Sequence, residues 1–294
     1  MLSPGQSAEI HHQIPGPARP GGPAPEVTVS GTPPRISVVI PVHCRTPEHR
    51  RYLEEALDSA ARQTFRDFEV VLVDDCSPLD IGPLTAAAGL PEARVLRQET
   101  NLGHARSRNR GVQAARGDLI AFLDHDDLWL PEKLARQLAV MEAHPEVGLV
   151  FCAVELFGPL ADRFPVRPGY IPTRPDFAWF ACRPNYVITA SAVLAQKRVL
   201  TAAGLFDPRY SSADDFDLWL KAARLAPLYY LPEKLVRYRL HAANVNYAAD
   251  LLNDNRLLTR LLWRAFLQSP FTERLKLLPA LARKLAGRVR LLLL

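Results

Sequence analysis

Residues 118–127 read DLIAFLDHDD, an uninterrupted apolar run that ends in a cluster of acids. An apolar run of this length is typical of a strand that is buried on both faces of a parallel sheet. Residues 69–75, EVVLVDD, repeat the arrangement, with Asp74 and Asp75 at the end of a second apolar run. In parallel sheets the carboxyl ends of the strands share one edge, and ligands bind beyond that edge. The two stretches therefore predict an α/β fold with an acidic site at the carboxyl edge of its sheet.

Apolar runs and helical patterns alternate on both sides of these two strands. Strand-like runs occur at 36–40, 93–97, 147–154, 187–194 and 235–240, and helical patterns at 53–60, 79–88, 104–116, 131–144, 196–203 and 215–225. Strands that alternate with helices predict a mostly parallel sheet, flanked by helices and connected by right-handed crossovers. Residues 155–190 interrupt the pattern, because prolines and aromatic residues dominate there.

The composition is that of a soluble globular protein, since the 294 residues are 48% hydrophobic and 23% charged. No apolar run approaches the roughly 18 residues of a membrane-spanning helix. The first residues also lack the pattern of a secretory signal. Four cysteines without a C-x-x-C pair predict a reduced, cytoplasmic protein rather than one with disulfides or a zinc site. Residues 1–34, rich in proline and glycine, are predicted to form a disordered leader.

The positive charge of the chain is concentrated at its C-terminus. Residues 255–294 contain nine Lys or Arg and one Glu, whereas the whole chain has a net charge of +5. A nucleic-acid enzyme would spread basic residues over its folded face, so no nucleic-acid partner is predicted. Apolar residues recur in this tail at helical intervals, namely Leu275, Leu278, Leu281, Leu285 and Val289. This pattern predicts a basic amphipathic helix on an anionic membrane surface. The alternatives are a helix that docks on the catalytic domain or on a second subunit.

Two acid clusters at one edge of a sheet favour a metal site. A single aspartate after a strand commonly caps a turn or a helix. Two neighbouring clusters repel each other, and a divalent cation with a preference for oxygen ligands relieves the repulsion. Mg²⁺ and Mn²⁺ usually bind through one or two carboxylates together with substrate phosphates. The pattern therefore points to a nucleoside diphosphate as part of the substrate.

Six motifs occur in a fixed order along the chain: ISVVIP at 36–41, VLVDDCS at 71–77, NLG at 101–103 with SRNRG at 107–111, FLDHDD at 122–127, DDFDLWL at 214–220 and YRLH at 238–241. Together they resemble the motifs of the family 2 glycosyltransferases. The resemblance implies a GT-A fold, which is Rossmann-like, over residues 35–246. A nucleotide-sugar-binding half would span 35–154 and an acceptor-binding half 155–246, with the basic helical tail at 247–294. Two residues depart from the family pattern, because Cys76 replaces the commoner glycine or asparagine and Asp214 the usual glutamate.

The resemblance also implies roles for residues that bind the donor. The turn formed by Pro41, Val42 and His43 would lie against the nucleoside, and Asp75 would accept a hydrogen bond from its base. Asp124 would bind the ribose hydroxyls.

A further set of residues is implied to act on the diphosphate and the acceptor. Asp126 would hold the cation, Mn²⁺ or Mg²⁺, that bridges the diphosphate, and Asp215 would be the general base. His241 would meet the diphosphate or the metal, or else be a surface histidine at the end of a strand. Arg108 would reach the donor, or else form part of a solvated face with the neighbouring arginines.

Other residues near the motifs receive different predictions. His125 is expected to point away from the site, because side chains alternate along an extended strand. Asn109 and Trp219 are expected to serve packing. Trp179 and Phe180 are candidates for lining an acceptor groove.

The predicted function is transfer of a sugar from a nucleotide-diphosphate sugar to a hydroxyl, by a metal-assisted single displacement that inverts the anomeric carbon. The enzyme would be an inverting hexosyltransferase of glycan, cell-surface polysaccharide or glycolipid assembly, with a carbohydrate or a lipid-linked acceptor. It would be cytoplasmic or peripheral on the cytoplasmic face of the membrane. One alternative is a non-catalytic nucleotide-sugar-binding module, which would lack the metal or base carboxylate. A sugar nucleotidyltransferase is disfavoured, since residues 41–45 contain no glycine for a phosphate-binding loop.

Overall fold

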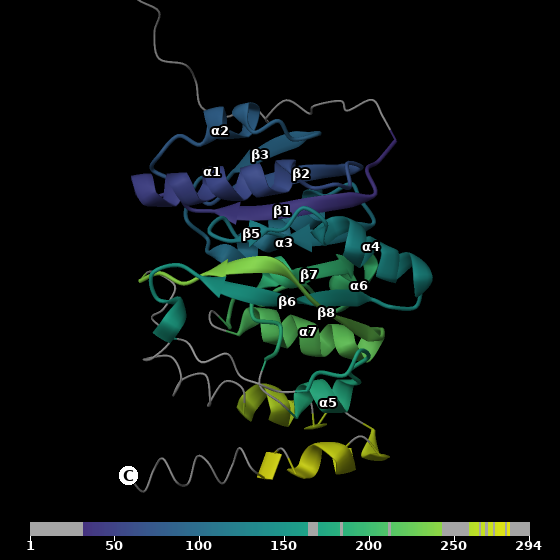
Figure 1. Cartoon of the computed structure of the whole chain (residues 1–294). Coiled ribbons are helices and arrows are strands. Elements are labelled where there is room, and N and C mark those ends of the chain that lie inside the picture. Colours follow the sequence, from purple (N-terminus) through teal and green to yellow (C-terminus); the bar gives the residue numbers. More distant parts are fainter. Residues whose placement is uncertain are drawn as a thin grey trace, which may run out of the picture. The chain divides into compact units, whose positions relative to one another are not determined.

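A mixed sheet forms the centre of the protein. The computed structural model describes residues 32–163, 170–182, 185–210, 213–242, 259–264, 266–267, 270–272, 274–279 and 281–282. Within these residues the sheet has eight strands in the order β3-β2-β1-β4-β7-β6-β8-β5 (Figure 1). The strands are β1 (Ile36–Val42), β2 (Phe68–Asp74), β3 (Ala93–Arg97), β4 (Leu119–Phe122), β5 (Leu128–Trp129), β6 (Leu149–Phe157), β7 (Val193–Gln196) and β8 (Leu228–Arg239). Most of the predicted leader at 1–34 lies outside the described residues.

Both parallel and antiparallel pairs occur in this sheet. Strand β1 pairs in parallel with β2 and β4, β2 with β3, and β6 with β8. Strand β7 runs antiparallel to β4 and β6, and β5 runs antiparallel to β8. The predicted α/β class with a mostly parallel sheet is confirmed, with the correction that β7 and β5 run in the opposite direction to the other six strands.

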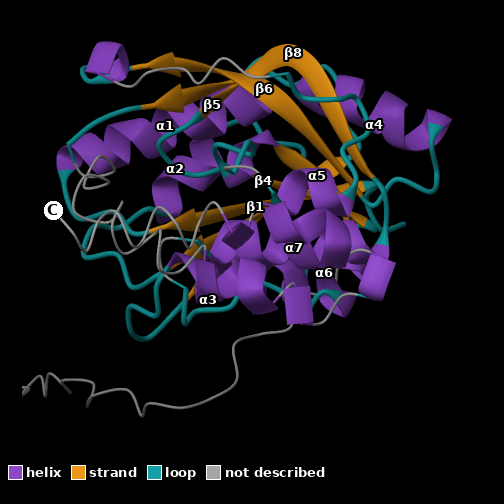
Figure 2. Ribbon diagram, turned by 90° about the horizontal axis from the view of Figure 1, so that it is seen from below, coloured by secondary structure: helices purple, strands orange, loops and turns teal. Residues whose placement is uncertain are grey.

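Helices cover both faces of the sheet (Figure 2). They are α1 (Pro47–Ala61), α2 (Gly82–Ala87), α3 (His104–Ala114), α4 (Lys133–Ala143), α5 (Phe177–Ala181), α6 (Lys197–Ala202) and α7 (Asp214–Leu225), with short 3₁₀ turns η1 (Ala161–Arg163) and η2 (Ala190–Ala192). Helices α1, α2 and α4 contribute to one hydrophobic cluster, and α3, α5, α6 and α7 to the other. The sheet therefore separates two layers of helices.

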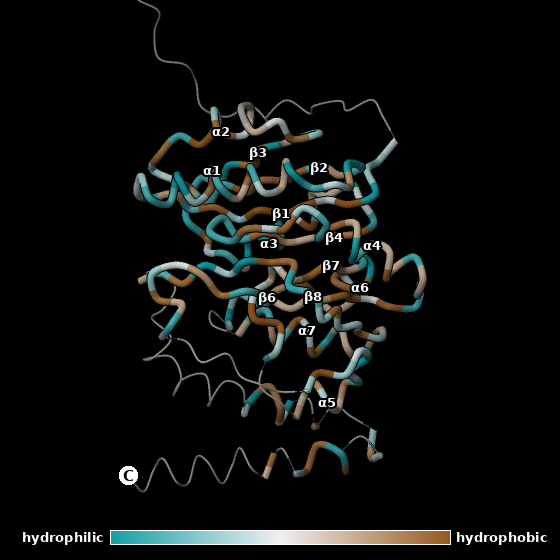
Figure 3. The backbone as a smooth tube through the Cα atoms, viewed as in Figure 1, coloured by the Kyte–Doolittle hydropathy of each residue, from teal (hydrophilic) through white to brown (hydrophobic). Residues whose placement is uncertain are grey.

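Strand β1 shows how the sequence pattern produces two cores. All seven of its residues are buried, and the apolar colouring of Figure 3 runs along the central strands. Val39 belongs to the cluster with α3 and α7, whereas Val38 and Ile40 belong to the cluster with α1. Gly111 lets α3 approach closely, since a Cβ there would lie 2.3 Å from Val39 Cγ1. The absence of a side chain at Gly111 thus fixes the distance between this helix and the sheet.

The two residues predicted to serve packing do so. The Asn109 amide donates to the Phe206 carbonyl at 2.8 Å and accepts from the Phe206 N–H at 2.9 Å. Trp219 is fully buried, and its ring centroid lies 5.7 Å from that of Phe206. Both residues join α3 or α7 to the loop that follows α6.

Several boundaries differ from the sequence-based expectation. Helix α4 begins at Lys133 rather than at Pro131, because residues 131 and 132 form a turn. Strand β8 begins at Leu228 instead of 235, and the proline-rich region contains the unpredicted helix α5. Phe180 of α5 is only 1% exposed and belongs to the core, so its predicted place in an acceptor groove is wrong. Trp179 is half-buried and packs on Tyr186, with ring centroids 5.4 Å apart.

Three side chains from β5 and α4 hold consecutive backbone carbonyls of η2 and β7. Trp129 Nε1 donates to the Ser191 carbonyl at 2.9 Å, and Gln137 Nε2 donates to the Ala192 carbonyl at 2.8 Å. Lys133 Nζ donates to the Val193 carbonyl at 3.2 Å. We call Trp129, Lys133 and Gln137 the carbonyl clamp, because together they fix the segment that precedes β7.

Lys133 is an unusual member of this clamp. Its side chain is fully buried, with Nζ 4.0 Å from the centroid of the Trp129 ring. Burial lowers the pKa of Lys133 from 10.5 to about 7, and the nearby Cys152 only partly opposes that effect. The ammonium is therefore stabilised by a carbonyl and an aromatic face rather than by a carboxylate.

The C-terminal tail docks on the folded unit through one of its sides. Leu261, Leu262, Leu277 and Leu281 are each at most 4% exposed and belong to the cluster that contains α5 and α7. The predicted apolar stripe is therefore wrong at Leu281, which faces the core, while Leu275 and Leu278 are exposed. The stripe's remaining members, Leu285 and Val289, lie outside the described residues. No helix in the described segments is both long and apolar enough to cross a bilayer.

Candidate active site

A cavity of about 330 Å³ opens beyond the carboxyl ends of β1, β2 and β4. This is the edge at which ligands bind in open α/β sheets. Every predicted site residue except His241 contributes to its wall, together with His104, His125, Ile188, Thr189, Ala190, Asp214 and Tyr238. The predicted members are Pro41, Val42, His43, Asp75, Arg108, Asp124, Asp126 and Asp215. The structure therefore brings together residues that are up to 174 positions apart, from Pro41 to Asp215.

Asp75 lies on the wall where β2 ends and is only 3% exposed. Its Oδ1 accepts from Gln98 Nε2 and from the Leu102 N–H, both at 2.7 Å, and its Oδ2 accepts from the Gly103 N–H at 2.8 Å. These contacts fix the turn that starts α3. A carboxylate has about four lone-pair positions, so Oδ2 keeps one acceptor position for a ligand.

His43 lies on the wall where β1 ends. Its Nδ1 is buried and has no hydrogen-bond partner among the described residues. Buried polar atoms normally have a partner, and an exception calls for an explanation such as a ligand. His43 lines the cavity while one of its ring nitrogens stays buried without a partner among the described residues.

Arg108 joins two acidic parts of the wall. Its guanidinium is buried, with Nη2 2.6 Å from Asp124 Oδ1 and Nη1 3.7 Å from Asp214 Oδ2. Burial alone would lower the pKa of Arg108, but Asp124 and then Asp214 outweigh that effect and raise it. Arg106 and Arg110 on the same helix are exposed. The alternative that Arg108 belongs to a solvated face is therefore wrong.

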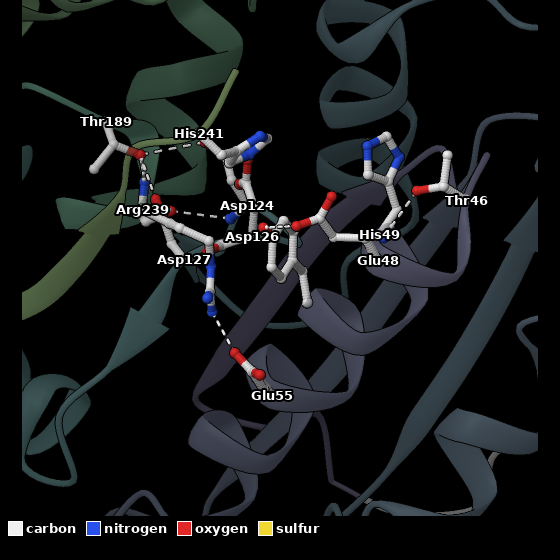
Figure 4. Close-up of polar contacts among 12 residues, drawn as sticks. Thr46, Glu48, His49, Glu55, Asp124, Asp126, Asp127, Thr189, Arg239 and His241 are labelled. Atoms are coloured by element: carbon white, nitrogen blue, oxygen red, sulfur yellow. Dashed lines mark hydrogen bonds and ion pairs between the residues drawn. The ribbon is translucent and has the colours of Figure 1, made fainter. Parts of the chain in front are cut away.

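Asp126 and His241 form a hydrogen-bonded pair beside the cavity. His241 Nε2 lies 3.0 Å from Asp126 Oδ2 (Figure 4). Burial would raise the pKa of Asp126, but the hydrogen bond to His241 and the charges of His125 and His241 outweigh it and lower the pKa. His241 is only 9% exposed, so it is not a surface histidine.

This pair fits a divalent cation that shares its coordination with a substrate. An ionised carboxylate and an imidazole are both ligands for Mn²⁺, and Mg²⁺ accepts one carboxylate plus phosphate oxygens. In the described segments no three Asp, Glu, His or Cys side chains converge on one point. The protein alone would therefore leave coordination positions for diphosphate oxygens and water.

Arg239, next to His241, holds the acidic loop against α1. Its Nε donates to the Asp126 carbonyl at 2.7 Å, and its Nη2 pairs with Glu55 (Figure 4). The guanidinium carbon lies 4.2 Å from the centroid of the Tyr52 ring. The YRLH motif thus places Tyr238 on the cavity wall, Arg239 on the loop backbone and His241 on Asp126.

Asp127 is a fully buried anchor rather than part of the cavity wall. Its Oδ2 accepts from the Thr189 and Ser191 hydroxyls at 2.9 and 2.6 Å, and its Oδ1 accepts from the Arg239 N–H at 3.1 Å. Burial, with the nearby Asp126 charge, raises the pKa of Asp127 well above its usual range. The residue links the acidic loop to η2 and β8.

His125 lines the cavity, so the prediction that it points away is wrong. The alternation rule applies to extended strands, but residues 124–127 form a turn in which the Asp127 N–H donates to the Asp124 carbonyl at 3.0 Å. The His125 ring packs edge-on against His49 at 5.8 Å between centroids. The turn therefore presents three successive side chains, residues 124–126, to the cavity.

The first turn of α7 supplies two carboxyls to the wall. Asp215 Oδ1 accepts from the Phe216 N–H at 2.6 Å, and Asn185 Nδ2 lies 3.4 Å from its Oδ2. Burial, followed by the charge of Asp214, raises the pKa of Asp215 to about 7. Asp214 is buried, 3.3 Å from His104 Nε2. A carboxyl in this state can accept a proton near neutral pH.

The sequence of the chain matches the family described as Glycosyl transferase family 2 over residues 37–184. The chain belongs to this family. It is thus a glycosyltransferase, and curated relatives include uncharacterized glycosyltransferases of Rickettsia prowazekii and Haemophilus influenzae. The first is 27% identical over 240 residues, covering 80% of this chain and 72% of the relative. The second is 27% identical over 227 residues, covering 75% of this chain and 74% of the relative.

Solved structures show the same fold. A structure of S. aureus TarS 1–349 in complex with UDP-GlcNAc is 21% identical, with a TM-score of 0.63, and the match covers 85% of this chain and 71% of that one. The mannosyltransferase PcManGT from Pyrobaculum calidifontis, in complex with GDP-Man and Mn²⁺, is 20% identical with a TM-score of 0.59, over 91% and 77% of the two chains. The predicted GT-A fold of this glycosyltransferase is confirmed.

Some wall residues of the glycosyltransferase were not predicted. His104 follows the NLG motif at the start of α3, so its position at the acidic edge could have been inferred from that motif. Thr189 Oγ1 lies 3.2 Å from Asp124 Oδ2. The strand predicted at 187–194 is wrong in its first part, because β7 begins only at Val193 and Thr189 lies in the loop that leads into η2. The position of such a loop is set by contacts with residues far away in the sequence, which local sequence patterns do not predict.

Proposed function

We propose that the glycosyltransferase moves a sugar from a nucleoside-diphosphate sugar to an acceptor hydroxyl in one displacement, with inversion at the anomeric carbon. The observation that carries the proposal is the position of Asp215, with its pKa raised to about 7, on the same cavity wall as Asp124 and Asp126. General bases are most effective when their pKa lies near the working pH. A donor site and a proton acceptor thus share one cavity.

The donor would be held at the carboxyl ends of β1, β2 and β4. We assign the nucleoside to the 41–43 turn and its base to the remaining acceptor position of Asp75. We assign the ribose hydroxyls to Asp124 and the diphosphate to the neighbourhood of Arg108. Structural neighbours in complex with UDP, UDP-GlcNAc and GDP-Man support this class of donor.

In the proposed reaction the acceptor oxygen forms a bond to the anomeric carbon as the bond from that carbon to the diphosphate oxygen breaks. The nucleoside diphosphate leaves with the bonding electron pair. Asp215 takes the proton of the acceptor hydroxyl. Attack on the face opposite the leaving group inverts the anomeric configuration. Base catalysis of this kind contributes about 10²–10⁴-fold in rate.

Asp126 and His241 are the residues we assign to a divalent cation, Mn²⁺ or Mg²⁺. When bound, the cation would stabilise the negative charge that grows on the leaving diphosphate. The lowered pKa of Asp126 keeps this carboxylate ionised for that purpose.

We infer an acceptor that is a carbohydrate or a lipid-linked glycan, as in the assembly of cell-surface polysaccharide or glycolipid. The proposed setting is the cytoplasm. Cys44, Cys76, Cys152 and Cys182 are all free, which suits a reducing compartment.

The first experiment is a thermal-shift panel of UDP-, GDP- and dTDP-sugars with and without Mn²⁺. A donor at a hundredfold excess over its Kd stabilises the protein by about 2.7 kcal/mol. We expect a metal-dependent shift with one nucleotide class, its loss in Asp126→Ala and its retention in Asp215→Asn. Donor hydrolysis or transfer by Asp215→Asn should fall by about 10²–10⁴-fold.

The control is Asp118→Asn, which removes an exposed carboxylate outside the cavity and should behave as wild type. In the wild type, kcat/KM should rise with pH through about 7, because Asp215 must be deprotonated to act. Wild-type rates in Asp215→Asn would refute the assignment of the base. Donor binding without turnover of any acceptor would favour the non-catalytic alternative.

A further inference from the structure

A row of exposed apolar side chains runs along the C-terminal tail. Its members are Trp263, Leu267, Phe271, Leu275 and Leu278, which are between 45% and 74% exposed. Trp263 and Leu267 are four residues apart before Pro270, which is not helical, and Phe271, Leu275 and Leu278 are four and three residues apart after it. On each side of Pro270 this spacing places the side chains on one side of a helix. Single exposed apolar residues are common, but a contiguous set marks a contact surface. We call these five residues the tail row.

The other side of the tail is already occupied by the catalytic unit. Leu261, Leu262, Leu277 and Leu281 are buried in the core cluster, and Arg264 Nη1 lies 4.0 Å from Asp217 Oδ1 of α7. The tail is therefore held in place by one apolar side while it exposes a second one. An amphipathic helix needs only one apolar side to dock on its own unit. The exposed apolar side of the tail is therefore not explained by that docking.

Basic residues accompany the tail row. Arg260, Arg264 and Lys276 are exposed, and residues 255–294 contain nine Lys or Arg against one acid. Exposed apolar and aromatic residues beside a basic cluster are the features of a surface that binds anionic lipid headgroups and inserts its apolar side chains. From this geometry we propose that the tail row docks the protein on an anionic membrane surface.

The charge distribution favours a membrane over a second copy of the chain. Pairing of two tail rows would bring two strongly basic tails together, and like charges oppose such an interface. An anionic leaflet would attract the tail and repel the remainder of the chain, which has a net negative charge without the tail. This inference goes beyond the proposed reaction and does not depend on it, because membrane binding is measured without donor or acceptor.

The test is flotation of the full chain with phosphatidylcholine vesicles that contain about one-third phosphatidylglycerol, compared with phosphatidylcholine alone. We expect wild type to float with the anionic vesicles only. The double variant Phe271→Ser/Leu275→Ser should lose at least about tenfold in vesicle partitioning. Truncation of the tail is a poor substitute, since it would also remove the buried leucines of the core cluster.

The matched control is Val95→Ser/Leu225→Ser, which removes two exposed apolar side chains, 40% and 53% exposed, outside the tail. It should float as wild type does. A charge variant, Arg260→Gln/Lys276→Gln, leaves the tail row intact and should also weaken flotation. If the serine variant melts at a lower temperature than wild type, its loss of flotation could come from lost stability. The charge variant then decides the test.

Three results would overturn the proposal. One is equal flotation of wild type and both tail variants, and another is equal flotation of wild type with neutral and anionic vesicles. The third is that wild type does not float but forms a dimer in analytical ultracentrifugation, and that Phe271→Ser/Leu275→Ser converts this dimer to a monomer. That result would assign the tail row to contact with a second copy of the chain.

Discussion

Replacement of Lys133 by methionine should change how the stability of the protein depends on pH. Methionine has a similar length and no charge, so it can occupy the same buried position beside Trp129. In the wild type the buried ammonium loses its proton at about pH 7, whereas in the unfolded chain a lysine does so near 10.5. Between these values the unfolded chain binds one more proton than the folded protein. Wild-type stability should therefore rise with pH through this window.

The size of the effect follows from the two pKa values. One unit of pKa corresponds to about 1.4 kcal/mol, so burying Lys133 costs about 5 kcal/mol well below pH 7. Between pH 7.5 and 9.5 the free energy of unfolding of wild type should rise by about 2.5 kcal/mol relative to Lys133→Met. Other titrating groups, Cys152 included, are present in both proteins and largely cancel in this difference.

Urea denaturation of both proteins at several pH values between 7.5 and 9.5 measures this difference. Lys133→Arg is a useful companion, because a buried guanidinium cannot lose its proton, and it should be less stable than Lys133→Met throughout. A difference between wild type and Lys133→Met that stays constant over the pH range would show that Lys133 remains protonated in the fold. That result would refute the reasoning.

Three further substitutions test the packing around the site. Asn109→Ala leaves both backbone groups of Phe206 without their partner and should lower the free energy of unfolding by about 1–3 kcal/mol in urea titrations. Gly111→Ala should cost a similar amount, about 1–3 kcal/mol, because the new Cβ would overlap Val39, and unchanged stability would mean that α3 can move away from β1. Arg108→Met removes the cation that pairs with the partly exposed Asp124 and lies beside the buried Asp214, and should cost about 3–5 kcal/mol. If that variant melts at the same temperature as wild type, the ion pairs of Arg108 contribute little to stability.

The first half of the fold, residues 35–154, could be predicted from local sequence. The apolar runs of β1, β2 and β4 have no polar face, which indicates strands covered on both sides, and each ends in residues that line the cavity. Because parallel strands share a carboxyl edge, Asp75, Asp124 and Asp126 could be expected to lie together without knowledge of the tertiary structure.

The second half could not be predicted to the same degree, since its residues are positioned by distant contacts. Phe180 is aromatic in a proline-rich region and has no pattern that separates a core residue from a ligand contact. His125 occupies a turn, where the alternation of a strand does not apply. Leu281 and Leu278 share a helical periodicity, but only the docking of the tail decides that the first is buried and the second exposed.

The carbonyl clamp has a consequence for how tightly a donor can bind. Trp129, Lys133 and Gln137 bind the carbonyls of residues 191–193, which directly follow the Thr189 loop. Thr189 Oγ1 lies 3.2 Å from Asp124 Oδ2. This side of the cavity is thus ordered by folding. A donor that binds there would not lose binding free energy to the ordering of this segment. Affinity and folding stability then depend on the same three side chains behind the cavity. Loosening them would weaken substrate binding from a distance, and a screen for tighter donor binding could recover substitutions in α4 that never contact the ligand.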